Sequence, residues 1–188
     1  MIRPLRTIRR LLVATSLLVT MTAPLPVLAD GHTVTTTAVG TRSASVADLT
    51  LTAVTYSHSA QTQTGTMTLT AADETTEGLG WNVTILSSDF VYTGTNGGIA
   101  IPAANFAITA ANAPVFVSGQ AIDPVGGPKV PATSPVGALN SARKVIQAEA
   151  TFGKGTYTQE FNVSLSIPAM SRAGTYTGTL TTTIAAAP

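Results

Sequence analysis

Few side chains in this sequence could carry out chemistry. The chain has no cysteine and two histidines, and only His58 lies in the part expected to fold. A Ser-His-Asp triad would need His58, but no Gly-x-Ser-x-Gly elbow exists, so we expect a solvated histidine near a turn. Asp73, Glu74 and Glu77 could hold a weak calcium ion, although the Asp-x-Asp-x-Asp-Gly spacing of a dedicated loop is missing and a solvated acidic turn is the default. The residue types therefore predict no enzyme, no metal site and no cofactor.

The single tryptophan, Trp81, admits two interpretations. Trp81, Val83 and Ile85 alternate with polar residues, which places them on one face of a predicted strand. We expect a core position, because burying this side chain stabilises a domain by several kcal/mol at roughly 25 cal/mol per Å². The alternative is an exposed ring that stacks on a sugar. Replacement of Trp81 by alanine separates the two, since the first predicts unfolding and the second predicts lost binding without unfolding.

Short alternating segments dominate the rest of the chain. Threonine is abundant and often occupies alternate positions, as suits a β-branched residue on a pleated sheet. The pattern predicts a possible short strand at 33–37, and further strands at 49–56, 66–70, 81–85, 104–110, 115–117, 143–152, 156–167 and 174–188. It predicts turns at 59–65, 73–80 and 94–98, and a hairpin turn at 153–155. About eight or nine short strands without helical crossovers predict an all-β fold, specifically an antiparallel β-sandwich.

Residues 119–142 interrupt this pattern. They contain four prolines and four glycines, too many for a regular ladder, and are uncharged apart from Asp123 and Lys129. The composition predicts an insertion loop, either one that binds another protein or a soluble glycan, or a disordered one. We expect shortening of this loop to leave folding intact.

The N-terminus predicts export. Residues 1–29 combine a basic start, a short apolar stretch from Leu11 to Met21, and Ala29 before a cleavage point, which is typical of a secretory signal peptide. The apolar stretch is too short to span a bilayer, so we expect no membrane span after cleavage. We divide the chain into the signal peptide (1–29), a polar Thr/Ser-rich leader (30–48) and a single β-sandwich domain (49–188).

Removal of the signal peptide changes the charge of the chain. The full sequence has a net charge of +1, but four of its ten basic residues and none of its nine acidic residues lie in 1–29. The mature chain therefore carries a net charge of about −3. A weakly acidic surface without clustered cations argues against nucleic acid as a partner, because neutralising phosphates requires many cations. Without cysteine, stability must come from the core rather than from disulfides.

Two segments resemble the signature strands of a bacterial family. The first is Gly80-Trp81-Asn82-Val83, which follows a polar turn containing glycine. The second keeps Gly174, Thr175, Tyr176 and Leu180, with Thr182 and Ile184 at later positions that carry Trp and Leu in the family. They resemble the Gly-Trp-x-Leu/Val and Gly-Thr-Tyr-x-x-x-Leu-x-Trp-x-Leu motifs of the WxL domain, a cell-wall-binding module of secreted surface proteins. The resemblance spans roughly residues 49–188.

The resemblance implies a secreted, extracellular protein that binds the bacterial cell wall noncovalently at the cell surface. The ligand would be a cell-wall glycan, either peptidoglycan or its attached polymers, and other surface proteins would be further partners. The resemblance also implies that Trp81, Val83, Tyr176 and Leu180 contribute to binding.

A function of another class stays open. The protein could be a structural subunit of an extracellular filament or surface layer that assembles by strand complementation. The leader would then complete an open sheet edge in a neighbouring copy, although its sizeable apolar residues are only Val34, Val39 and Val46. Deletion of residues 30–47 should abolish higher-order species in that case, whereas a wall-binding domain should keep its affinity for the wall.

Overall fold

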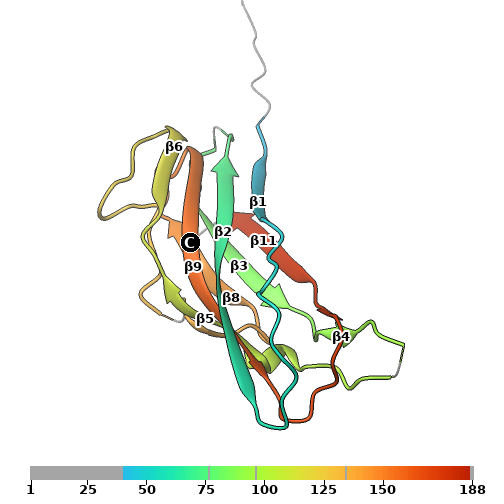
Figure 1. Ribbon diagram of the computed structural model, residues 1–188. Helices are drawn as coiled ribbons and strands as arrows, with labels where there is room; N and C mark the ends of the chain where they lie inside the picture. The colour runs from blue at the N-terminus through green and yellow to red at the C-terminus, as the bar shows by residue number, and fades with distance from the viewer. Residues whose placement is uncertain (1–39, 76, 96, 134, 187–188) are drawn as a thin grey trace, which may run out of the picture. The chain divides into compact units, whose positions relative to one another are not determined.

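The computed structural model describes residues 40–186 apart from 76, 96 and 134, and they belong to one compact unit. The predicted signal peptide and the possible strand at 33–37 lie outside these residues. Strands dominate the described chain, with one 3₁₀ turn, η1 (Ala103–Asn105) (Figure 1). The strands are β1 (Arg42–Val46), β2 (Gln61–Asp73), β3 (Trp81–Ser87), β4 (Val91–Tyr92), β5 (Phe106–Ala111), β6 (Val115–Gly119), β7 (Gly137–Ala138), β8 (Arg143–Ala148), β9 (Gly155–Ile167), β10 (Tyr176–Thr177) and β11 (Leu180–Ala186). In this part of the chain, no helix has the length and apolar character needed to cross a membrane.

These strands form two main sheets with antiparallel pairing throughout. The first sheet has the order β1-β2-β9-β5-β7, and β6 also pairs with β9. The second sheet has the order β11-β3-β8, and β10 pairs with β4 in a separate two-stranded ribbon. Buried side chains from both sheets meet in one cluster. The predicted all-β, antiparallel, sandwich-like single domain is confirmed.

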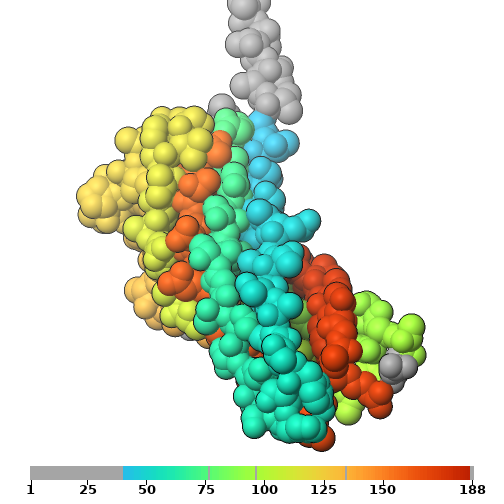
Figure 2. Space-filling model, in the orientation of Figure 1, coloured from blue at the N-terminus to red at the C-terminus, as the bar shows by residue number. Residues whose placement is uncertain are grey.

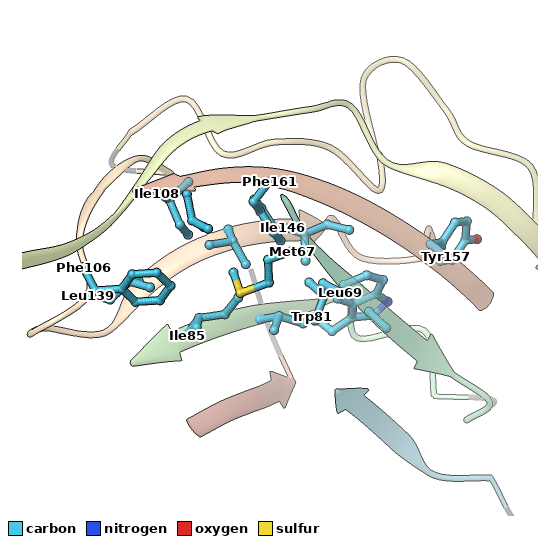
Figure 3. Packing of buried hydrophobic residues seen from close by; sticks show 14 of the residues in the cluster. Met67, Leu69, Trp81, Ile85, Phe106, Ile108, Leu139, Ile146, Tyr157 and Phe161 are labelled. Atoms are coloured by element: carbon cyan, nitrogen blue, oxygen red, sulfur yellow. The ribbon is translucent and has the colours of Figure 1, made fainter. Parts of the chain in front are cut away.

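Alternation along three long strands builds the core. Threonines at alternate positions of β2 are exposed, and the apolar residues between them are buried. Figure 3 shows Met67 and Leu69 of β2 beside Trp81 and Ile85 of β3. The buried apolar side chains on these strands are Met67, Leu69 and Ala71 of β2, Trp81, Val83 and Ile85 of β3, and Tyr157, Phe161, Val163 and Leu165 of β9. Since each strand turns one apolar face inward, the two sheets close over a shared interior.

The structure corrects the prediction for residues 49–65. The segment 49–56 is not a strand, and 59–65 is not a turn, because β2 already begins at Gln61 and continues for 13 residues between β1 and β9. Leu49 and Leu51 alternate with polar residues because they pack against the core from a segment without ladder hydrogen bonds. A period of two was present in the sequence, but it marked side-chain packing rather than strand pairing.

The predicted hairpin at 153–155 is also wrong. β8 pairs with β3, whereas β9 pairs with β2, β5 and β6, so the connection crosses from one sheet to the other. Gly153 in this connection has a φ of +76°, and a Cβ there would lie 2.5 Å from Ala148 Cβ and 2.7 Å from Trp81 Nε1. Glycine is therefore needed where the crossing chain passes the tryptophan.

Much of the segment 119–142 packs against the sheets. Lys129 and Gln147 of β8 exchange two backbone hydrogen bonds, at 2.8 and 3.0 Å, and Leu139 is fully buried. The Asp123 carboxylate accepts backbone hydrogen bonds from Gly126 and Val125, which hold the pKa of Asp123 below its ordinary value. These contacts contradict a disordered loop. The expectation that shortening leaves folding intact is therefore replaced by an expected loss of stability.

Tyr157 of β9 ties the start of this segment to the first sheet. Its buried hydroxyl donates a hydrogen bond to the Gln120 carbonyl at 2.6 Å, with the Lys154 carbonyl 3.2 Å away. Desolvation raises the pKa of Tyr157, and the nearby negative charges of Asp73 and Glu74 raise it further. The neutral hydroxyl is therefore the form that the fold favours.

Candidate functional site

The two signature segments are neighbouring strands of the second sheet. β3 carries the first signature, and β11 carries the end of the second. Their register sets Ile184 opposite Val83 and Ala186 opposite Trp81. Thr182, which stands where the family motif has a second tryptophan, is half-buried on the same face as Leu180 and Ile184. The signatures thus build one shared piece of sheet rather than two separate sites.

Trp81 is a core residue. Its side chain has no exposed surface, and its indole Nε1–H donates a hydrogen bond to the Gly153 carbonyl at 2.9 Å. The Tyr157 ring lies close by, with ring centroids 6.3 Å apart. Val83 on the same strand face is equally buried. The expectation of a core position is confirmed, and in this structure neither side chain is available to stack on a sugar.

Tyr176 is half-buried, packs against the core and anchors the second signature. Its ring meets the ring of Tyr92 on β4 edge to face, with centroids 5.3 Å apart. The Tyr176 hydroxyl donates to the Arg172 carbonyl at 2.9 Å, and the Tyr92 hydroxyl donates to the Ala173 carbonyl at 3.1 Å. A Cβ at Gly174 would lie 2.3 Å from the Tyr92 ring. The glycine of the Gly-Thr-Tyr signature therefore leaves room for the Tyr92 ring, and the tyrosine of the signature, Tyr176, packs against that ring.

A groove lies between the segment 49–57 and the segment 171–180, and we call it the lateral groove. It consists of two adjoining cavities of about 690 and 470 Å³. Both cavities are lined by Leu49, Leu51, Phe90, Thr177 and Gly178. In Figure 2 the cyan segment after β1 and the red C-terminal segment lie next to each other along this side. The second signature supplies the wall of the groove, since Gly174, Thr175 and Tyr176 line the larger cavity and Leu180 lines the smaller one.

The larger cavity combines apolar surface with a few polar groups. Tyr56 is 49% exposed at its edge, and Tyr176 lines it from the other segment. Gln61 and Gln63 line it from β2, and the Gln61 amide nitrogen donates a hydrogen bond to the Thr55 carbonyl at 3.1 Å. Arg172 is the one charged side chain among the described residues that line it. Aromatic rings can stack on the apolar face of a sugar, amides can bond its hydroxyls, and a guanidinium can bind a carboxylate or a phosphate.

Only part of this lining was predictable from the sequence. Tyr176 and Leu180 followed from the family resemblance, whereas Tyr56, Arg172 and the two glutamines of β2 were missed. Gln61 and Gln63 occupy half-buried positions that continue the inward face of Met67. Polar residues at inward positions of a strand are the signal that could have marked the groove.

The other candidate groups have structural partners. The His58 Nδ1 atom lies 3.1 Å from Met170 Sδ, and its ring contacts Tyr56. Its Nδ1 therefore faces a thioether, where a catalytic triad would place a carboxylate.

Arg42 of β1 forms ion pairs with two of the acidic residues at 73–77. The Arg42 Nε atom lies 3.4 Å from Asp73 Oδ1, and its guanidinium also bonds Glu77 Oε2 at 3.0 Å. Asp73 is almost completely buried and also accepts hydrogen bonds from Thr75. This ion pair ties β1, which lies inside the polar leader, to β2 of the first sheet. In the described chain, no group of three or more His, Cys, Asp or Glu side chains comes together as a metal site.

Comparison with known proteins agrees with the signature strands. Searches of the curated proteins and of the solved structures returned no match. A family model described as "WxL domain surface cell wall-binding" matches residues 32–188 and so includes both signature strands and the lateral groove. The chain belongs to the WxL family of surface cell wall-binding domains.

Proposed function

We propose that this protein is exported, remains at the cell surface, and binds the bacterial cell wall noncovalently through the lateral groove. The ligand is a glycan of the wall, either peptidoglycan or an attached polymer. The family match supports wall binding as the general function. The observation that carries the groove assignment is that the second signature forms its wall through Gly174, Thr175, Tyr176 and Leu180.

The four signature residues then divide into two roles. Trp81 and Val83 are buried and act by holding β3 in place beside β11. Tyr176 lines the larger cavity and Leu180 lines the smaller one, and Tyr56 supplies a second ring to the lining of the larger cavity. Arg172 adds a positive charge that suits the carboxylates or phosphates of wall polymers. The proposed activity is binding alone, without catalysis.

Co-sedimentation with purified peptidoglycan sacculi tests this proposal. The chain from Asp30, the form expected after signal cleavage, should sediment saturably, and an unrelated soluble β-sandwich should not. Tyr56→Ala and Arg172→Gln should each weaken sedimentation, because their side chains line the groove and lie outside the core. Loss of one ring–sugar contact corresponds to roughly 0.5–1.5 kcal/mol, or about a two- to tenfold change in Kd.

A matched control uses another exposed apolar residue. Ile99 is 91% exposed and does not line either cavity of the groove. Ile99→Ala should therefore sediment as the unchanged chain does. Equal binding by Tyr56→Ala, Arg172→Gln and Ile99→Ala would contradict the proposal that the groove binds the wall. Absence of saturable binding by the unchanged chain would remove these sacculi as the ligand.

A further inference from the structure

β6 (Val115–Gly119) is an edge strand with an exposed, apolar and uncharged surface. Among the described residues it pairs only with β9, so the backbone groups on its other side have no strand partner. Figure 1 shows it at the margin of the first sheet, on the far side from β1. The side chains of Val115, Phe116 and Val117 are 60%, 46% and 53% exposed. Edges are usually blunted by charge, proline or a bulge, and within β6 only a register irregularity at Val117 is present.

The opposite edge of the same sheet is different. β1 exposes Ser43 and Ser45, and it turns Arg42 inward to the buried carboxylate of Asp73. An inward-pointing charge and small polar side chains are devices that discourage pairing with another chain. β1 is therefore a protected edge of the first sheet, whereas β6 can accept a strand.

We propose that β6 accepts the leader of a second copy of this chain, through residues 33–37. This segment reads Thr-Val-Thr-Thr-Thr, so all five residues are β-branched and none is charged. Its length equals the five residues of β6. Since neither strand carries a charge, pairing meets no like-charge repulsion, and an added strand would cover part of the exposed apolar surface of β6.

Chain length favours a second copy over the same chain. Residues Arg42, Asp73, Gly155 and Gly119 lie in one row across β1, β2, β9 and β6. A strand beyond β6 would lie four strand spacings from β1, about 19 Å. The link from Thr37 to Arg42 spans at most about 18 Å when fully extended, and it would also have to pass around the ends of the intervening strands. A neighbouring copy can present its leader without this strain.

Such pairing is head to tail, because the donor segment and the acceptor edge are different parts of the molecule. Repetition generates a row of copies, which stays open unless the rotation between neighbours closes it into a ring. β6 contributes no residue to the lining of the lateral groove. Assembly is therefore independent of wall binding, and the two properties can fail separately.

Disulfide trapping tests the pairing directly, since the chain has no cysteine of its own. One preparation carries Thr35→Cys in the leader, and a second carries Ser118→Cys on β6, where the side chain is exposed. Mixed under mild oxidation, they should give a cross-linked heterodimer in clear excess over the mixture of Thr35→Cys with Thr68→Cys. Thr68 is exposed in the middle of the sheet and serves as the matched control. Equal cross-linking of both mixtures, or none, overturns the proposal.

Sedimentation velocity gives a second measurement on the chain from Asp30. Larger species should increase with protein concentration, and Val117→Lys should remove them. Val125→Lys should not, because Val125 is also exposed but lies outside β6. Trp81 fluorescence reports whether each variant is folded. Loss of assembly in both lysine variants, or in neither, contradicts a role for β6.

Discussion

Replacement of Trp81 by alanine should unfold the domain rather than remove a binding contact. The indole is fully buried, and truncating such a side chain costs about 3–5 kcal/mol. The substitution also leaves the Gly153 carbonyl without its 2.9 Å hydrogen bond, which adds about 1 kcal/mol. The expected loss of about 4–6 kcal/mol is comparable with the whole stability of a small domain, which is about 5–15 kcal/mol.

Urea unfolding followed by far-UV circular dichroism measures this loss, because the variant has no tryptophan to report by fluorescence. Leu86→Ala is the matched control, since Leu86 lies on the same strand but is 37% exposed, and it should lose less than about 1 kcal/mol. Trp81→Phe keeps a buried ring and should lose about 2 kcal/mol while it still sediments with sacculi. Trp81→Ala with unchanged stability and no wall binding would mean that the indole is a binding contact and not a core residue.

Three further substitutions test the packing around the core. Gly153→Ala should cost about 2–3 kcal/mol in urea unfolding, because its Cβ would meet Trp81, whereas Gly97→Ala, also at positive φ but in open space, should cost about 1 kcal/mol. Arg42→Met should cost about 3 kcal/mol by leaving the buried Asp73 carboxylate unpaired, and adding Asp73→Leu should recover part of that loss. Because the pKa of Tyr157 is raised in the folded protein, its hydroxyl ionises at a lower pH in the unfolded chain than in the folded one. The free energy of unfolding of the wild type should therefore fall as the pH rises above 10.0 towards the folded pKa. Tyr157→Phe should lack this fall, and parallel slopes of stability against pH in the two proteins would contradict the assignment.

The strands that cover the core were predictable, because burial imposes an alternating pattern on their sequence. β3, β5, β6 and β9 lie where the apolar residues alternate or cluster. The fold class followed from the same pattern together with the absence of helical crossovers. The core position of Trp81 was also predictable, since Val83 and Ile85 share its strand face and both are buried.

The prediction failed beside the lateral groove, and the reason is physical. The first half of β2 turns Gln61 and Gln63 towards the groove rather than towards the core, so it lacks the apolar alternation of a strand. Leu49 and Leu51 pack on the core without pairing and therefore imitate a strand. The crossing at Gly153 was missed because a short glycine-containing connection can join two strands of one sheet or pass between sheets. Sequence spacing alone does not separate these cases.

The most direct test of wall binding through the lateral groove is an NMR titration of the chain from Asp30 with soluble peptidoglycan fragments. Binding in the lateral groove should give saturable shift changes at the backbone amides of residues 49–57 and 171–180. The amides of β6, which does not line the groove, should change little. Shifts concentrated outside the groove, or no saturable shifts, would mean that the wall glycan does not bind there.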